Sequence, residues 1–369
     1  MTLYDYFDAY AADYAPYKEG RWCYEDGLLY LALVRLHHTT GDDRWLSHLL
    51  RLTDAQITAN GDILGYTVDE YNIDNILSGR CLFYLAKRVD TSRYMSAADQ
   101  LITQLRSHPR LTTGNYWHKQ RYPHQVWLDG LFMALPFQVE FGLTNGDDAL
   151  IDDAIDQLRC ALALTQTQDG LYVHGYDHSH DQSWSNDENG QSPAVWARAV
   201  GWLAMALVDL VDLLGDDPRS PKREAVSAMR AIAAQQRDNG LWHQVMAMPD
   251  LSGNYDESSA SAMFAYALMK SERLGLTRTA DAGKRAFDAL CMSKMRMIDG
   301  RKKFDDICCV AGLGGFDGVY RDGTPAYYIS EAIKPDDIKG VGPLAYALCE
   351  AEMKSAKATP IAAVLSASK

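Results

Sequence analysis

Residues 122–137 read Y-P-H-Q-V-W-L-D-G-L-F-M-A-L-P-F and surround one carboxylate, that of Asp129, with aromatic and aliphatic side chains. Placing a carboxylate beside so much apolar surface costs free energy unless the group is paired or used. An apolar setting raises the pKa of a carboxyl group, which can then hold a proton near neutral pH and act as a general acid. The same residue could instead cap the helix that follows it. This stretch alone leaves both interpretations open.

A second carboxylate of interest is Asp74, in the stretch Y-N-I-D-N-I-L-S-G-R. Taken alone, Asp74 also reads as a helix N-cap. Together with Asp129 on a neighbouring helix it would form a carboxylate pair. Two carboxylates across a pocket are the usual equipment for cleaving a glycosidic bond.

Aromatic and cationic side chains are dense in residues 111–125, which include Tyr116, Trp117, His118, Lys119 and Arg121. Aromatic rings beside cations suit a sugar that bears a carboxylate. A solvated basic turn would have the same composition, so this interpretation also stays open.

Residues 165–195 form the longest polar stretch, and a long loop in a compact domain is usually functional or disordered. Three histidines and an acid lie in it, but their spacing matches no metal-ligand motif on a helix. We therefore expect no metal, and we expect His174 to make polar contacts with a substrate.

The stretch W-A-R-A-V-G-W follows this loop and places Arg198 and Trp202 four residues apart, on one helix face. An arginine there could clamp a carboxylate through two hydrogen bonds. Pairing with a neighbouring acid is the alternative.

Composition limits the classes of function. The chain has 369 residues, of which 47% are hydrophobic and 23% charged, so it can form a large core and is not of disordered composition. Its net charge of −13 argues against a nucleic-acid partner, which normally requires a basic face. No apolar run approaches the roughly 20 residues of a membrane span.

The cysteines and the first residues bear on location. The seven cysteines are scattered, odd in number and form no C-x-x-C motif, which fits a reducing compartment and disfavours zinc ribbons. The first ten residues carry acids where a signal peptide has lysine or arginine. We expect a cytoplasmic protein, either a monomer or a homodimer.

Six apolar runs share the pattern of a small residue followed by apolar residues and alanine. They are Gly27-LLYLAL, Gly79-RCLFYLA, Gly130-LFMALP, Gly201-WLAMAL, Ala262-MFAYAL and Gly342-PLAYAL. Each is apolar nearly all round, which is typical of a helix buried on every side. The small residues are expected to permit close helix packing near the axis.

Amphipathic helices with one polar face are predicted between these runs. Their expected ranges are 3–14, 45–58, 95–107, 148–164, 223–237 and 280–292. Twelve helices that alternate in this way close most simply into an all-α, (α/α)6 barrel, with six parallel inner helices. We expect one such domain over residues 1–369, with a frayed tail from about residue 355.

Parallel inner helices would start on one face of the barrel, so the residues just before each small residue should meet on one rim. These are Tyr24, Glu25, Asp26, Asp74, Asn75, Trp127, Asp129, Trp196, Arg198, Tyr255, Ser258, Asp336 and Lys339. The helix N-termini would also direct partial positive charge at that rim, which favours an anionic ligand.

These motifs together resemble one known family. The stretches D-N-I, W-H-K, H-Q-V-W-L-D-G-L-F-M, Y-V-H-G-Y-D, S-P-A-V-W-A-R-A-V-G-W, N-Y-x-E-S-S-x-S-A-M-F, Y-Y-I-S-E and D-x-K-G-V-G-P occur in order over nearly the whole chain. They are similar to those of the unsaturated rhamnogalacturonyl hydrolases, glycoside hydrolase family 105. The related unsaturated glucuronyl hydrolases of family 88 share the fold and the two aspartates.

The resemblance implies a role for each matching residue. Asp129 would be the general acid/base and Asp74 its essential partner. The uronate subsite would be lined by Tyr24, His118, Lys119, Trp127, Met133, His174, Arg198 and Trp202. The pair Asp177-His178 departs from the family's Asp-Glu, which leaves the preference for the leaving sugar open.

The resemblance also implies a reaction. The enzyme would remove a 4,5-unsaturated uronic acid from the non-reducing end of oligosaccharides that polysaccharide lyases leave. Water would be added across the C4=C5 double bond, and no metal or organic cofactor would be needed. A standard inverting glycosidase or a lyase on the same barrel, and a sugar-binding or epimerase-like barrel, are the alternatives. The sequence leaves open whether Glu25, Asp26 or Glu257 also reaches the site.

Overall fold

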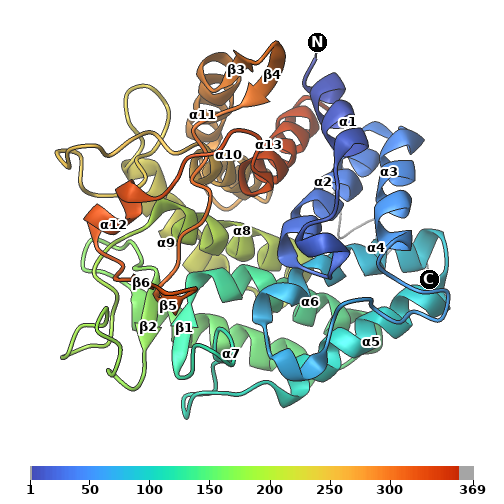
Figure 1. Cartoon of the computed structure of the whole chain (residues 1–369), viewed down its shortest axis with the longest axis horizontal. Coiled ribbons are helices and arrows are strands. Elements are labelled where there is room, and N and C mark those ends of the chain that lie inside the picture. The colour runs from blue at the N-terminus through green and yellow to red at the C-terminus, as the bar shows by residue number, and fades with distance from the viewer. Residues whose placement is uncertain (1, 357–369) are drawn as a thin grey trace.

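The inner ring of the barrel consists of six helical segments. The computed structural model describes residues 2–356, so the tail expected to fray lies almost entirely outside the described residues. The segments are α2 (Tyr24–Thr40), the 3-10 helix η3 (Ile73–Gly79) continued by α4 (Arg80–Arg88), α6 (Leu128–Asn145), α8 (Ala197–Leu214), α10 (Ser258–Arg273) and α13 (Ile338–Ala356). Each packs against the next and α13 packs against α2, which closes the ring (Figure 1).

Six outer helices return the chain between the inner segments. They are α1 (Leu3–Asp13), α3 (Asp43–Asp54), α5 (Thr91–Ser107), α7 (Asp148–Thr165), α9 (Lys222–Ala234) and α11 (Ala280–Ser293). The predicted (α/α)6 barrel is confirmed, including the order of outer and inner helices.

Some predicted helix ends were wrong because capping residues were overlooked. The side chain of Asp42 accepts a hydrogen bond from the backbone N–H of Arg44, and Asp90 accepts one from that of Arg93. The helices α3 and α5 therefore begin earlier than expected. The first inner turn before α4 is a 3-10 helix, which its apolar pattern did not reveal.

The small residues let neighbouring inner segments approach closely, as predicted. A Cβ atom on Gly27 of α2 would lie only 2.4 Å from Ser78 Oγ in η3, and one on Gly201 of α8 would lie 2.6 Å from the sulfur of Met263 in α10. No side chain fits in either place without a shift of its neighbour. The ring therefore depends on glycine at these positions.

A buried carboxylate joins four inner segments at the far end of the barrel. Asp209 of α8 lies 3.1 Å from a guanidinium nitrogen of Arg35 in α2, 2.9 Å from one of Arg80 in α4, and 2.7 Å from the ammonium of Lys270 in α10. Burial alone would raise the pKa of Asp209, but these cations hold it well below its usual range. The charged cluster thus ties the end of the ring opposite the helix N-termini.

The chain leaves four outer helices through the same kind of turn, at Gly61, Gly114, Gly170 and Gly240. Each glycine has a positive φ, between +82° and +100°, which other residues rarely adopt. Each turn leads to the start of the next inner segment, so it lies on the face where the inner helices begin. Three of these hairpin-like turns were predicted, and the structure confirms them.

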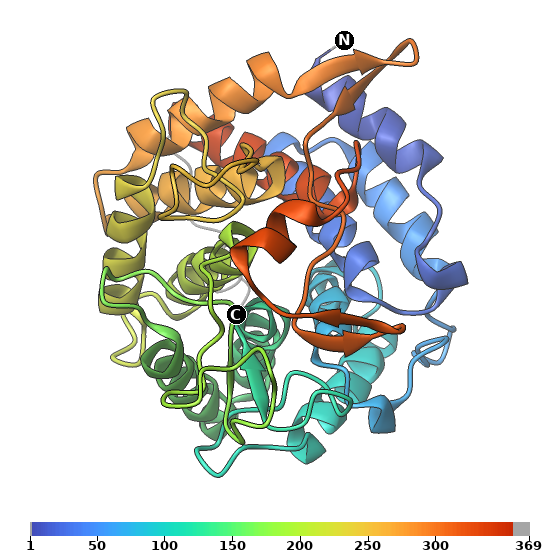
Figure 2. The ribbon, with the colours of Figure 1, turned by 60° about the vertical axis from the view of Figure 1, so that its left-hand side comes forward.

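Strands are short and serve as links between loops. Three two-stranded antiparallel pairs occur in residues 2–356: β1 (Gln125–Trp127) with β2 (Gly175–Asp177), β3 (Met295–Ile298) with β4 (Arg301–Phe304), and β5 (Gly314–Phe316) with β6 (Val319–Arg321). Residues 305–335, which include β5, β6 and α12 (Pro325–Ser330), cross the face where the inner helices begin (Figure 2). No helix among residues 2–356 combines the length and apolar character of a membrane span.

Replacing Gly27 by alanine tests the close packing of the ring. The new methyl group would collide with Ser78, so we expect Gly27→Ala to lower the free energy of unfolding by about 1–3 kcal/mol. Gly130→Ala is the matched control, since Gly130 also lies in the first turn of an inner helix but its Cβ would have no neighbour within 3.4 Å. Chemical denaturation should show the control unchanged or more stable. Equal effects in both variants would contradict the packing account.

Candidate active site

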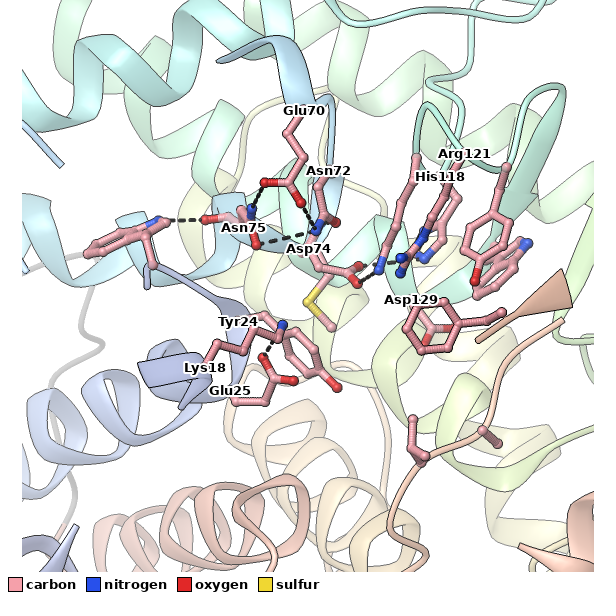
Figure 3. Close-up of a pocket in the computed structure, with 18 of the residues that line it drawn as sticks. Lys18, Tyr24, Glu25, Glu70, Asn72, Asp74, Asn75, His118, Arg121 and Asp129 are labelled. Carbon is pink, nitrogen blue, oxygen red and sulfur yellow. Dashed lines mark hydrogen bonds and ion pairs between the residues drawn. The ribbon is translucent and has the colours of Figure 1, made fainter. Parts of the chain in front are cut away.

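A cavity of about 390 Å³ opens where the inner helices begin, on the side of α2, η3 and α6 (Figure 3). Seven of the residues that the sequence singles out line it: Tyr24, Asp74, His118, Lys119, Trp127, Asp129 and Met133. Figure 3 shows Lys18, Tyr24 and Glu25 on the α2 side of this cavity, with Asp74 and His118 facing them. Side chains from distant parts of the chain therefore meet around one space.

Neither aspartate caps its helix. The N-cap of α6 is Trp127, so Asp129 already lies in the first turn of the helix. In η3 the N-cap is Asn72, whose side-chain oxygen accepts a hydrogen bond from the backbone N–H of Asp74. The capping interpretation is therefore wrong for both residues, and both carboxylates face the cavity instead.

Asp129 lies beside a buried histidine. Its Oδ2 atom is 3.0 Å from Nε2 of His174, although the contact is not aligned well enough to count as a hydrogen bond. The other ring nitrogen, Nδ1, is 2.7 Å from the hydroxyl of Tyr328. If that hydroxyl donates to Nδ1, the ring proton lies on Nε2 and faces Asp129. His174 is fully buried and absent from the cavity lining, so it acts on the site through Asp129.

Asp74 is held as a carboxylate by a neighbouring ammonium group. The Nζ atom of Lys119 forms an ion pair with Asp74 Oδ2, and Nε2 of His118 lies 3.6 Å from Oδ1. Burial alone would raise the pKa of Asp74, but Lys119 outweighs that effect and the pKa lies below its usual value. Asp74 therefore stays ionised at neutral pH.

A stack of rings forms the wall between the two aspartates. The ring of Trp127 lies 4.2 Å from that of His118 on one side and 4.8 Å from that of Tyr122 on the other, both nearly parallel. Burial lowers the pKa of His118 to about 3, so its imidazole is neutral near pH 7. The wall thus presents flat apolar faces, of the kind that pack against a sugar ring.

Polar atoms without a protein partner gather at this cavity. Among the described residues, Oδ1 of Asp74, Nδ1 of His118, Oδ2 of Asp129 and Nε2 of His174 are buried and have no hydrogen-bond partner. Buried polar groups are normally paired, and exceptions in one place require an explanation. The hydroxyl groups of a bound sugar, or water, would supply the missing partners.

Arg198 and Trp202 lie behind the cavity and do not line it. The guanidinium of Arg198 is 99% buried and donates hydrogen bonds to the carbonyl oxygen of Cys308 and to Ser259. Trp202 stacks against Phe132 in the core. Their assignment to the uronate subsite stays a prediction.

Only half of the predicted rim faces the cavity, because residues 305–335 cover the rest. Over α8, the carbonyl of Cys308 binds Arg198 and the ring of Tyr328 stacks on Trp196 at 5.4 Å. At the start of α10, the backbone N–H of Ser258 donates to the carbonyl of Asp306. The expectation that six helix starts surround one site was therefore wrong for the side formed by α8 and α10.

Several acids that the sequence left undecided now have clear positions. Glu25 lines the cavity and pairs with Lys18 at 3.1 Å. Asp26 instead accepts hydrogen bonds from Tyr14 and Gln56, and Glu257 caps α10 through the N–H of Ala260.

The unusual pair Asp177-His178 lies beside β2 and outside the cavity lining. Asp177 is buried and accepts hydrogen bonds from Ser179 and Gln182, so it fixes the shape of its loop. His178 contacts Thr112 at 3.1 Å.

Sequence reasoning missed three contributors to the site. Tyr328 orients His174, and Phe316 and Arg321 of the β5–β6 hairpin line the cavity. The Gly-rich segment around them was expected to cover the pocket, which the structure confirms. Which of its side chains point inward depends on how the loop folds, and no local pattern encodes that.

Comparison with known proteins agrees with this geometry. The family model described as Glycosyl Hydrolase Family 88 matches residues 6–355. The solved structure of a family 105 glycoside hydrolase from C. acetobutylicum ATCC 824 is 34% identical, with a TM-score of 0.89 over 95% of this chain and 100% of that one.

Two relatives with curated names also match. Protein Atu3128 of Agrobacterium fabrum (strain C58) is 52% identical over 227 residues, which are 59% of this chain and 97% of that protein. The unsaturated rhamnogalacturonyl hydrolase YesR of Bacillus subtilis (strain 168) is 24% identical over 265 residues, 69% of this chain and 72% of YesR. The chain therefore belongs to Glycosyl Hydrolase Family 88, together with the family 105 glycoside hydrolase that it matches over nearly its whole length.

Proposed function

We propose that this glycosidase removes a 4,5-unsaturated galacturonyl group, linked to rhamnose, from the non-reducing end of oligosaccharides that lyases release from pectin. The family supports an unsaturated uronyl hydrolase, and the relative YesR carries the name of an unsaturated rhamnogalacturonyl hydrolase. The single observation that carries the proposal is the pair of buried carboxylates, Asp129 and Asp74, on one sugar-sized cavity with flat aromatic walls.

In the proposed reaction Asp129 acts first as an acid and then as a base. It donates a proton to C4 of the C4=C5 double bond, and its carboxylate takes a proton from the water that adds at C5. The resulting hemiketal opens, which breaks the bond to the leaving sugar. His174, 3.0 Å away, stabilises the carboxylate form that Asp129 adopts between the two steps.

The other cavity residues would bind and orient the sugar. Lys119 holds the carboxylate of the unsaturated sugar and shares its ammonium group with Asp74. Trp127 and His118 offer their ring faces, and Asp74 in its ionised form accepts hydrogen bonds from sugar hydroxyls. Arg198 adds a buried positive charge behind Tyr24.

We further propose that the enzyme works in the cytoplasm. All seven cysteines are free thiols in the structure, and Cys23, Cys81, Cys308 and Cys349 are buried. This state is the usual one in a reducing compartment.

Replacing Asp129 by asparagine tests the catalytic assignment. Asp129→Asn cannot donate or accept the proton, so we expect kcat on an unsaturated galacturonyl-rhamnose disaccharide to fall about 100-fold to 10,000-fold. The loss of ultraviolet absorbance of the double bond follows the reaction. Asp156→Asn, which removes an exposed carboxylate on α7, is the control and should keep full activity. Half-normal activity in Asp129→Asn would show that another group supplies the proton.

The charge on Lys119 should set the acid limb of the pH profile. Without its ammonium group, burial is left to raise the pKa of Asp74, so Asp74 becomes protonated at a higher pH. Because the proposal needs Asp74 ionised, the acid limb of kcat in Lys119→Met should shift to higher pH. Lys119→Arg keeps the charge and should keep the position of the limb. An unshifted limb in Lys119→Met would contradict the role given to Asp74.

A further inference from the structure

Positive charge at the mouth of the cavity exceeds what the reacting sugar requires. Five cationic side chains line the cavity: Lys18, Arg21, Lys119, Arg121 and Arg321. Lys18 pairs with Glu25 and Lys119 pairs with Asp74. The three arginines form no ion pair with a carboxylate within residues 2–356, although the protein carries a net charge of −13. Unpaired cations concentrated in one place on an acidic protein favour an anionic ligand.

Two of these arginines share one aromatic ring. The guanidinium carbon of Arg121 lies 4.4 Å from the centre of the Phe316 ring, and that of Arg321 lies 5.3 Å from the same centre. Two like charges around one ring repel each other, and no protein carboxylate relieves that repulsion. An anion placed between them would be attracted by both, and each guanidinium can offer it parallel N–H donors.

The position of this pair separates it from the reacting sugar. Asp129 keeps only 16% of its side chain exposed, whereas Arg121 is exposed and Phe316 is 40% exposed. The terminal sugar must reach the buried aspartates, so the rest of the oligosaccharide extends outward past the exposed residues. Arg121 and Arg321 therefore lie where the leaving part of the substrate passes.

The hairpin that carries Phe316 and Arg321 is attached to the wall of the site. The backbone N–H of Trp184 donates to the hydroxyl of Tyr320 at 3.2 Å. Leu313, just before β5, packs in a small cluster with Trp184, Trp127 and Tyr122. The two guanidinium groups are thus fixed relative to Trp127.

We propose that Arg121 and Arg321, with Phe316 between them, form a subsite for a carboxylate on the leaving part of the substrate. The enzyme would then prefer oligosaccharides that carry a further uronate beyond the sugar released, over fragments with a neutral leaving part. Phe316 is a positioning residue, and the arginines bind. This inference rests on the proposed function, because it assumes that an unsaturated uronyl sugar occupies the inner cavity.

Three unsaturated substrates test the subsite: the galacturonyl-rhamnose disaccharide, the tetrasaccharide with an internal galacturonate, and a synthetic tetrasaccharide with galactose in place of that galacturonate. We expect kcat/KM of the wild type to be about tenfold higher for the acidic tetrasaccharide than for the neutral one. The ratio should fall as salt is added, because the contact is exposed.

Variants locate the effect. In the double variant Arg121→Gln/Arg321→Gln, the ratio of the two kcat/KM values should fall to about one. Arg21→Gln removes one charge from the same cavity without touching Phe316, and it should keep most of the ratio. Phe316→Leu, which removes the ring between the guanidinium groups, should lower the ratio through KM and leave kcat on the acidic tetrasaccharide nearly unchanged.

Each other outcome overturns the inference in a distinct way. If the wild type cleaves both tetrasaccharides equally, the subsite does not exist, while the proposed function stands. If the double variant keeps the preference, other groups read the carboxylate. If it loses activity on the disaccharide by the same factor, the arginines bind the unsaturated sugar itself. If the wild type consumes none of the three substrates, the proposed function falls and the inference falls with it.

Discussion

The close approach of α2 and η3 decides where the catalytic carboxylates lie. Because Gly27 has no side chain, Ser78 reaches α2 and donates a hydrogen bond to the carbonyl of Cys23 at 2.5 Å. Trp22 reaches back and donates to the carbonyl of Asn75 at 2.8 Å. These contacts hold the 3-10 helix in the ring, and Asp74 lies in its first turn, opposite the start of α6. A bulkier residue at position 27 would move Asp74 and its partner Lys119 away from Asp129.

The segment 305–335 turns a symmetric barrel into a one-sided site. It binds Arg198 and stacks on Trp196 over one half of the ring, and its hairpin carries Phe316 and Arg321 to the mouth of the cavity. The buried half supplies rigidity and charge from behind, while the open half supplies the two aspartates. An acidic protein thereby keeps a locally cationic entrance for an acidic sugar.

The sequence predicts the features that depend on local patterns. Six runs that are apolar all round specify the inner ring, and Asp129 and Asp74 stand out because they interrupt such surfaces. The prediction fails where the answer depends on a long-range contact. Asn72 and Asp74 can both cap η3, and only the folded chain shows that Asn72 does so. The burial of Arg198 depends on a carbonyl 110 residues away along the chain.

The most direct test of the account compares an unsaturated galacturonyl-rhamnose disaccharide with its saturated twin, using the wild-type enzyme. If the double bond is the site of reaction, only the unsaturated sugar is consumed, and its ultraviolet absorbance disappears as rhamnose is released. Cleavage of the saturated twin at a similar rate would contradict hydration, and Asp129 and Asp74 would then form an ordinary glycosidase pair.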